Sequence, residues 1–328
     1  MKIVITGASG FIGTHLARAL LALERTPDGR AIEQVLLTDH APSAAGDRRA
    51  RFVEGDVGDP AQLARLIEPD TDLVFHLAGI MSAAAEADFG LGLRVNLDAT
   101  RQLLEACRAL ARPARPMRFV YASSIAVFGA PLPAEIDDST PTRPTLSYGA
   151  HKLACEILLD DYTRRGFVDG RALRLPGIVV RPRAQGKAGA LSAFNSDLLR
   201  EPLEGRAVSS PVGPDAVLWL LSIERCVENL IHAAMLPGEA LGPRRALNLP
   251  CVAASVSEIA AALGRAAGKS AEALVVYAPN PAIEAQFGRW PRAFQPERAL
   301  ALGFRADADI DDIIRLHLAA RPAPVAMR

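Results

Sequence analysis

The chain of 328 residues has few cysteines, few aromatic side chains and no excess of charge of either sign. Its four cysteines form no C-x-x-C pair and its six histidines are scattered, so we expect neither a disulfide framework nor a metal site. Thirty-seven basic residues balance 37 acidic ones, which excludes the strong positive field typical of nucleic-acid or anionic-membrane binding. A small polar metabolite is the expected partner, with no nucleic acid and no membrane.

Long apolar runs are also missing. Residues 1–7 have the pattern of a strand entering a turn, without the basic start and apolar stretch of a signal peptide. No stretch of about 18 uncharged apolar residues is available to cross a membrane. We therefore expect a cytoplasmic location.

Hydrophobic residues, in contrast, make up half of the chain. Apolar runs with little alternation mark strands covered on both faces, and longer stretches with helical spacing lie between them. This order predicts βαβ units and an α/β, Rossmann-type, doubly wound parallel sheet. The predicted strands are 2–6, 34–38, 51–53, 72–77, 117–123 and 171–180, and the predicted helices are 11–25, 60–68, 86–111 and 147–165.

The character of the chain changes after Pro182, where glycine, proline, serine and arginine become frequent. We expect a helix near 191–201, a strand near 217–221 and a helix near 223–236. This predicts an NAD-binding Rossmann domain at 1–182, which carries the catalytic residues. A smaller α/β substrate lobe follows at 183–328, with part of 217–250 returning to the main sheet.

A glycine-rich turn, Thr6-Gly7-Ala8-Ser9-Gly10-Phe11-Ile12-Gly13, follows the first predicted strand. Gly7 allows the tight turn, Gly10 lets backbone approach a pyrophosphate, and Gly13 lets helix pack close to strand. The helix then points free N–H groups and its positive end at the phosphates. A plain tight turn is the alternative reading, but the context favours a dinucleotide site. Its predicted contacts are Gly7, Ser9, Gly10, Phe11, Ile12 and Gly13.

Acidic and small residues follow the next strands. Asp39 ends the second strand, where a carboxylate can accept hydrogen bonds from the adenosine ribose and repel a 2′-phosphate, so NAD is favoured over NADP. The alternative for Asp39 is a turn or helix cap. Further predicted contacts are Asp56 and Val57 after the third strand, and Leu77, Ala78 and Gly79 after the fourth.

The candidate catalytic residues are Tyr148 and Lys152, four apart at the start of a predicted helix and therefore on one face. A phenol is a poor base at neutral pH, but a neighbouring ammonium stabilises its phenolate, which can then take a proton from a substrate hydroxyl. A Tyr-x-x-x-Lys match alone is weak. Here it follows a strand that ends in Ser123 and Ser124, where a hydroxyl can hold the reacting oxygen.

These motifs, with His76-Leu77-Ala78-Gly79 and the segment 121–129 (YASSIAVFG), resemble the extended short-chain dehydrogenase/reductase family. The resemblance implies that Ser124 is the catalytic serine and that Asn96 supports the active site. It further implies cofactor contacts from Ser123 and Pro176, and from Asn96, Tyr148 and Lys152. It also implies a homodimer through the helices near 86–111 and 147–165. Segments 85–110, 161–176, 217–222 and 227–242 are similar to the D-erythronate dehydrogenases of this family, which implies NAD-dependent oxidation of the C2 hydroxyl of D-erythronate to 2-oxo-tetronate.

A sugar acid needs an anion contact near the catalytic residues, although most arginines in such a set are structural or at the surface. His76 and His151 are better explained as a core histidine and a helix-surface histidine. The candidates for substrate contact, beside Ser124 and Tyr148, are Ser82, Arg143, Arg181, Arg183, Asn195 and Arg200.

Two alternatives stay open. A nucleotide-sugar epimerase or dehydratase with tightly held NAD shares the fold and the Tyr/Lys pair, but Pro176 stands where many epimerases carry asparagine, and no acidic pair follows Ser124. A dinucleotide-binding sensor without turnover would usually lack the Tyr/Lys pair, which this chain retains.

Overall fold

The computed structural model describes residues 1–42, 46–183 and 193–320. Its centre is a seven-stranded sheet in the order β3-β2-β1-β4-β5-β7-β11, with every neighbouring pair parallel. The order runs outward from β1 in both directions, which confirms the predicted doubly wound fold. The strands are β1 (Lys2–Thr6), β2 (Gln34–Thr38), β3 (Ala50–Phe52), β4 (Thr71–His76), β5 (Met117–Ser124), β7 (Val168–Leu175) and β11 (Ala246–Asn248).

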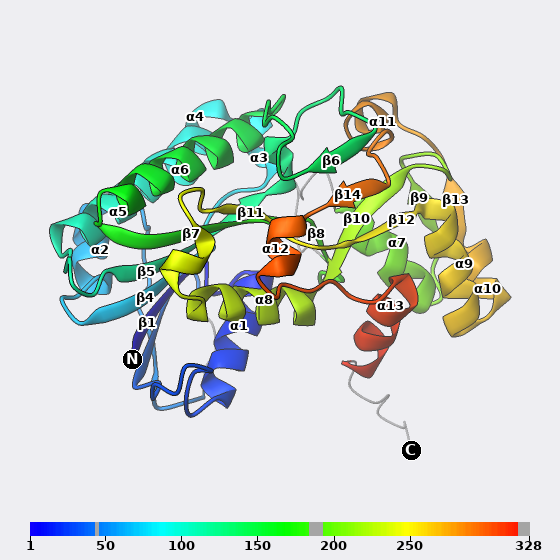
Figure 1. Cartoon of the computed structure of the whole chain (residues 1–328). Helices are drawn as coiled ribbons and strands as arrows, with labels where there is room; N and C mark the ends of the chain where they lie inside the picture. The colour runs from blue at the N-terminus through cyan, green and yellow to red at the C-terminus, as the bar shows by residue number, and fades with distance from the viewer. Residues whose placement is uncertain (43–45, 184–192, 321–328) are drawn as a thin grey trace, which may run out of the picture.

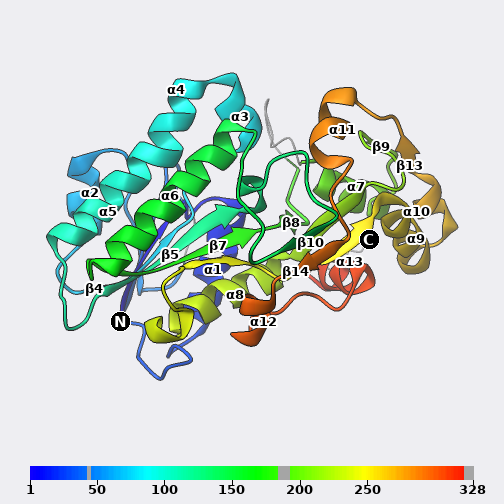
Figure 2. The same cartoon turned by 45° about the horizontal axis from the view of Figure 1, so that its top comes forward.

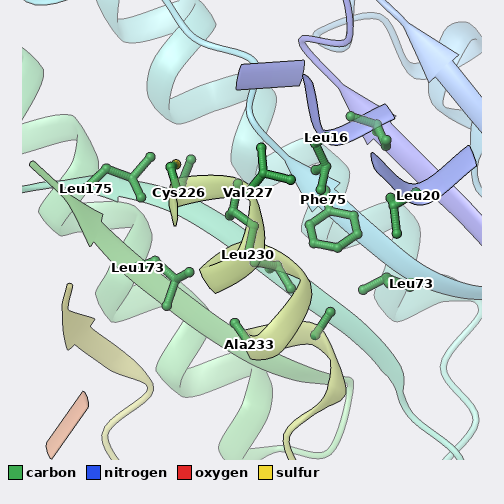
Figure 3. Packing of buried hydrophobic residues seen from close by; sticks show 14 of the residues in the cluster. Leu16, Leu20, Leu73, Phe75, Leu173, Leu175, Cys226, Val227, Leu230 and Ala233 are labelled. Carbon is green, nitrogen blue, oxygen red and sulfur yellow. The ribbon is translucent and has the colours of Figure 1, made fainter. Parts of the chain in front are cut away.

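Helices cover both faces of this sheet, because successive residues of a strand point to opposite sides. From β1, Ile3 and Ile5 pack in one core with α1 (Phe11–Ala22) and α8 (Ile223–Met235), whereas Val4 belongs to the core on the other face. Figure 3 shows Leu16 and Leu20 of α1 and Leu230 of α8 gathered over Phe75. The opposite face is covered by α2 (Pro60–Leu66), α5 (Ala99–Ala109) and α6 (Ser147–Arg164) (Figure 1).

The predicted helix at 86–111 is wrong as a single unit. The structure has α3 (Ser82–Ala87), α4 (Phe89–Gly92), a π-helical stretch η1 (Leu93–Asp98) and then α5. The break falls at Asp88, whose extended backbone ends α3 and whose carboxylate accepts a hydrogen bond of 2.8 Å from the N–H of Leu91. The apolar residues keep helical spacing on both sides of such a break, so the periodicity of the sequence alone does not reveal it.

The predicted strand at 171–180 is also two strands. β7 belongs to the main sheet, and β8 (Gly177–Val179) belongs to a second sheet with β10 (Val217–Ser222) and β12 (Val252–Ser255). Pro176 separates them, because it has no N–H to donate to a strand ladder. The chain leaves the main sheet at this residue.

The second sheet and its helices form a smaller lobe beside the main sheet (Figure 2). Within residues 217–250, β10 belongs to the lobe sheet, whereas α8 and β11 belong to the main sheet. The expected helix near 191–201 is seen from residue 194; segment 184–192 lies outside the described residues. The other elements are β6 (Glu135–Asp137), α7 (Phe194–Leu203), β9 (Val208–Ser210), α9 (Val256–Ala267), α10 (Lys269–Ala273), β13 (Val275–Tyr277), α11 (Pro281–Phe287), β14 (Ala293–Gln295), α12 (Glu297–Ala301) and α13 (Ile310–Ala319), with 3-10 turns at Ile125–Val127 and Gly238–Leu241.

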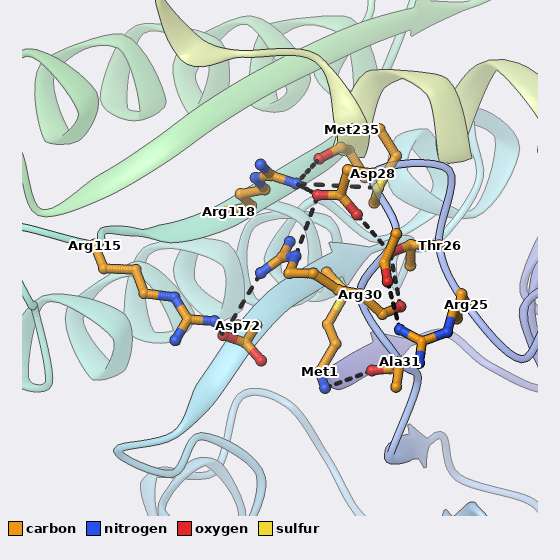
Figure 4. A network of polar contacts seen from close by, with 12 residues as sticks. Met1, Arg25, Thr26, Asp28, Arg30, Ala31, Asp72, Arg115, Arg118 and Met235 are labelled. Carbon is orange, nitrogen blue, oxygen red and sulfur yellow. Dashed lines mark hydrogen bonds and ion pairs between the residues drawn. The ribbon is translucent and has the colours of Figure 1, made fainter.

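The amino edge of the main sheet is held by an ionic network around the loop that follows α1 (Figure 4). Asp28 of this loop pairs with Arg118 at the start of β5 at 3.1 Å and with Arg30 at 3.2 Å. Burial acts to raise the pKa of Asp28, but hydrogen bonds from Thr26 and Arg118 outweigh it and lower the pKa. The candidate site residues lie at the opposite, carboxyl edge of the strands.

Candidate active site

The glycine-rich turn at the carboxyl end of β1 leaves no room for a side chain at Gly7 or Gly13. Gly7 has a φ of +69°, and a Cβ on it would lie 2.7 Å from the backbone nitrogen of Ala78. A Cβ on Gly13 would lie 2.2 Å from the carbonyl oxygen of Gly7, so the first turn of α1 packs directly on backbone. No side chain caps α1, and its first N–H groups therefore stay available to an anion, as a pyrophosphate site requires.

Asp39 lies at the end of β2 beside this turn. Its carboxylate accepts hydrogen bonds from the backbone N–H of Ser9 at 3.0 Å and of His40 at 2.8 Å. Asp56 instead closes a local turn by accepting from the N–H of Gly58 at 2.7 Å, and Val57 is buried in the core. The carboxylate of Asp39 is thus anchored to the glycine-rich turn, where a ribose would lie if the turn holds the pyrophosphate.

His76 is fully buried at the end of β4 and links the end of β1 to the start of α5. Its Nδ1 lies 2.7 Å from Thr6 Oγ1, and its Nε2 lies 2.9 Å from Thr100 Oγ1. Thr100 donates its single hydroxyl proton to the carbonyl of Asn96, so it must accept from Nε2–H, and Nδ1 must accept from Thr6. Burial, with a smaller effect of Lys152, lowers the pKa of His76 to about 3, which keeps this tautomer neutral.

Asn96 is buried in η1 and does not line the active-site cavity. Its side-chain amide bonds both backbone groups of Ile80, accepting from the N–H at 2.9 Å and donating to the carbonyl at 3.1 Å. A Cβ on Gly79 would lie 3.0 Å from Asn96 Oδ1, so the loop after β4 lies close against this residue. Asn96 therefore holds the loop of residues 77–80 in place, and π-helical stretches often occur at functional sites.

Tyr148 and Lys152 project from the first two turns of α6 toward the end of β5. Lys152 is buried, its ammonium donates to the carbonyl of Ala122 at 2.7 Å, and it lies 5.7 Å from the centre of the Tyr148 ring. Ser124 is half-buried, and its Oγ accepts from the N–H of Ala126 at 3.1 Å. The hydroxyl proton of Ser124 stays free to bond a substrate oxygen.

Glu156 is a buried residue of this site that the sequence reasoning missed. It accepts a hydrogen bond of 2.5 Å from Ser123 and forms an ion pair of 2.8 Å with Arg174. It follows Lys152 by four residues, so helical spacing alone could have placed it on the same face. Glu156 fixes Ser123 and stabilises Arg174, whose guanidinium lies 5.4 Å from the ring centre of Phe128.

The predicted residues meet at a cavity of about 180 Å³ between the main sheet and the lobe. Its wall includes Ile12, Leu77 and Gly79 near the glycine-rich turn, which would continue into a dinucleotide site. Further predicted residues in the wall are Ser82, Ser123, Ser124, Tyr148, Lys152, Pro176, Arg181 and Asn195. Sequence reasoning missed the hydrophobic part of the wall and Gln286: the missed side chains include Met81, Phe128, Leu132, Trp219, Gln286, Phe287 and Trp290.

Three predicted arginines are outside this wall. Arg143 is exposed, and Arg183 pairs with Glu201 at the surface. Arg200 is buried, pairs with Glu201 at 3.0 Å and donates to the carbonyl of Arg181 at 2.6 Å. It therefore positions the backbone of Arg181 instead of reaching the cavity.

The prediction for His151 is wrong, whereas that for His76 as a core residue agrees with its position. His151 is buried on α6, with its ring 6.0 Å from that of Phe89, and burial lowers its pKa.

Across residues 1–42, 46–183 and 193–320, no three potential metal-ligating side chains come together. In the same ranges, no helix has the length and apolarity to span a bilayer.

A family model described as the NAD dependent epimerase/dehydratase family matches residues 3–209, which include the glycine-rich turn and the Tyr/Lys pair. The chain belongs to this family. The resemblance to the extended short-chain dehydrogenases/reductases is thereby confirmed, and with it NAD as the cofactor.

Two curated members of the family are named D-erythronate dehydrogenase. The protein from Cupriavidus necator is 46% identical over 97% of this chain and 98% of its own length. The one from Haemophilus influenzae is 38% identical, over 96% and 98%. A solved structure from Agrobacterium tumefaciens, titled a nucleoside-diphosphate-sugar epimerase, is 40% identical with a TM-score of 0.90, over 98% of this chain and 94% of that one.

Proposed function

We propose that this enzyme oxidises the C2 hydroxyl of a four-carbon sugar acid, D-erythronate, to the 2-oxo acid with NAD as the oxidant. The two curated relatives named for this activity support the substrate class. The observation that carries the proposal is one cavity lined by a serine, the Tyr/Lys pair and an arginine that no carboxylate of the described residues neutralises.

In this mechanism the hydroxyl of Ser124 donates a hydrogen bond to the C2 oxygen and holds it beside Tyr148. The phenolate oxygen of Tyr148 accepts the proton of that hydroxyl, and the Lys152 ammonium stabilises the negative charge before the transfer. Lys152 keeps its position because Ala122 accepts one of its protons at 2.7 Å. The bound cofactor supplies the acceptor for the hydride that leaves C2.

Arg181 is the residue that we assign to the substrate carboxylate. Its Nε donates to the carbonyl of Ile178 at 3.2 Å, and among the described residues no other group accepts from its guanidinium. Burial lowers the pKa of Arg181, whereas the nearby Tyr148 acts to raise it. The positive charge of the guanidinium therefore lies in a partly dehydrated environment close to the reacting group. A carboxylate would bond the free end of this guanidinium in a bidentate manner.

The test is a panel assay. Purified enzyme and NAD are mixed with D-erythronate, D-threonate, five- and six-carbon sugar acids and a UDP-sugar, and NADH formation is followed by absorbance. We expect the highest kcat/KM with D-erythronate. NADH formation with none of the sugar acids would contradict the proposal, and conversion of the UDP-sugar without net NADH would favour the epimerase alternative.

Two variants separate the residue roles in the same assay. Tyr148→Phe should lower kcat by at least a thousandfold while NAD binding stays nearly unchanged, because only the proton acceptor is lost. Arg181→Met should raise KM for sugar acids by ten- to a hundredfold but leave NAD binding intact. A Tyr148→Phe enzyme with normal kcat would refute the base assignment.

We also propose that the enzyme is a homodimer through α4, α5 and α6. These helices form one outer layer of the molecule (Figures 1 and 2), and Phe89 and Ile157 on this layer are 61% and 63% exposed. Large apolar side chains on the same helical layer fit an interface better than a free surface.

A further inference from the structure

The side chain of Asn195, at the start of α7, is buried in the cavity wall without a hydrogen-bond partner among the described residues. Only 6% of the residue is exposed, and its Oδ1 is buried with no hydrogen bond to any described residue. No described group bonds its Nδ2 either. An unpaired buried amide of this kind destabilises the fold, so its presence needs another explanation, and a ligand supplies one.

The backbone beside Asn195 leaves space for its amide. A Cβ on Gly177 would lie 2.8 Å from Asn195 Nδ2 and 3.0 Å from the carbonyl oxygen of Trp219, so only glycine leaves the amide its place. The N–H of Arg181 donates to Ser196 at 3.0 Å, and Arg200 binds the carbonyl of Arg181. The first turns of α7 therefore fix Arg181 and Asn195 relative to each other.

The surrounding wall offers little other polarity. The indole N–H groups of Trp219 and Trp290 are already donated to the carbonyls of Pro291 and Gln286, at 2.8 and 2.6 Å. Leu218 and Phe287 complete an apolar surface there. Of the lobe side chains from residue 193 onward that line the cavity, only Asn195 and Gln286 carry a free polar group.

We infer that Asn195 binds a hydroxyl of the substrate beyond the reacting carbon and thereby selects a polyhydroxy acid over a deoxy acid. An amide presents both a donor and an acceptor, which is the pattern of a hydroxyl group. We leave the carboxylate to Arg181, because a guanidinium offers a positive charge and two parallel donors, whereas the amide is neutral. The inference rests on the proposed function, and it specifies which part of the sugar acid the lobe recognises.

The experiment uses Asn195→Leu, which keeps the volume and removes the polarity. Kinetics with NAD are measured for D-erythronate and for 2-hydroxybutyrate, which lacks the C3 and C4 hydroxyls. We expect the wild-type enzyme to prefer D-erythronate by at least a hundredfold in kcat/KM. The variant should lose ten- to a hundredfold on D-erythronate and change less than threefold on 2-hydroxybutyrate.

A stability measurement excludes a merely structural role. Because Asn195→Leu removes an unsatisfied buried amide, the thermal midpoint of the enzyme without substrate should stay the same or rise. The matched control is Asn229→Leu on α8: Asn229 is equally buried, but its amide bonds both backbone groups of Arg305, at 2.8 and 3.1 Å. That variant should lose stability yet keep the wild-type preference between the two acids.

A second variant, Gly177→Ala, should displace the amide and weaken the preference in the same direction. Equal losses on both acids in Asn195→Leu, or a wild-type preference below tenfold, would overturn the inference. These results differ from a failure of the proposed function, in which the wild-type enzyme oxidises neither acid.

Discussion

His76 shows at the scale of one residue how a buried side chain ties stability to pH. In the unfolded chain a histidine binds a proton below about pH 6.5, whereas folded His76 stays neutral down to about pH 3. Between these values the unfolded state binds more protons, so stability contributed by neutral His76 is present above pH 6.5 and is lost as the pH falls. The expected slope approaches about 1.4 kcal/mol per pH unit.

Denaturant unfolding of wild type and His76→Gln between pH 4.5 and 7 tests this expectation. The variant should be less stable at pH 7, because two hydrogen bonds of the Thr6–His76–Thr100 chain are changed, but its stability should fall less steeply with acid. His15→Gln on α1 serves as the matched control for loss of an imidazole. Parallel pH profiles for wild type and His76→Gln would contradict the role.

The sequence places some candidate site residues correctly on the fold, because their positions depend on local spacing. Tyr148 and Lys152 share a helix face, and the glycines sit in one turn. Arg181 and Arg200 could not be distinguished in this way. Whether an arginine reaches a cavity or binds a neighbouring carbonyl depends on how α7 packs, and that is a long-range property.

At the scale of elements, Gly13 decides how closely α1 approaches its turn. Its missing Cβ would lie 2.2 Å from the backbone oxygen of Gly7, and backbone cannot move aside as a flexible side chain can. Gly13→Ala should therefore push α1 outward and reduce stability by about 1–3 kcal/mol, as overpacking does. Denaturant unfolding without NAD measures this loss.

Gly10→Ala is the matched control, because its Cβ would lie 3.2 Å from the same oxygen and its φ of −69° suits alanine. It should cost clearly less stability than Gly13→Ala in the absence of NAD. Equal losses would mean that close packing of α1 on the turn is not what Gly13 provides.

Element boundaries were harder to predict than element types. The stretch 171–180 is rich in Leu, Ile and Val, yet its two halves belong to different sheets, because Pro176 interrupts the ladder. The stretch 86–111 keeps helical spacing across Asp88, where the chain nevertheless breaks. In both cases a single residue ends the element, although the surrounding sequence continues the same pattern.

At the scale of the whole molecule, the cavity is made by residues that lie far apart in the chain. Lys152 and Tyr148 come from the Rossmann part, whereas Trp219 and Trp290 come from the lobe. The two tryptophan rings meet edge to face with centres 4.6 Å apart, and no sequence pattern brings them together. The motifs therefore located the Tyr/Lys end of the cavity and some of its polar residues, but they did not predict its hydrophobic wall.

The proposed homodimer is tested on its exposed apolar side chains. Placing a charge at the centre of an interface of α4, α5 and α6 would bury it without a partner, so Phe89→Glu with Ile157→Glu should convert a dimer into a monomer. Light scattering during gel filtration at micromolar concentration gives the mass directly. The matched control is Val276→Glu with Leu300→Glu, whose side chains are 52% and 53% exposed on β13 and α12. That variant should stay dimeric, since it carries the same added charge away from the helical layer. A wild-type monomer, or dissociation of both variants alike, would contradict the proposed interface.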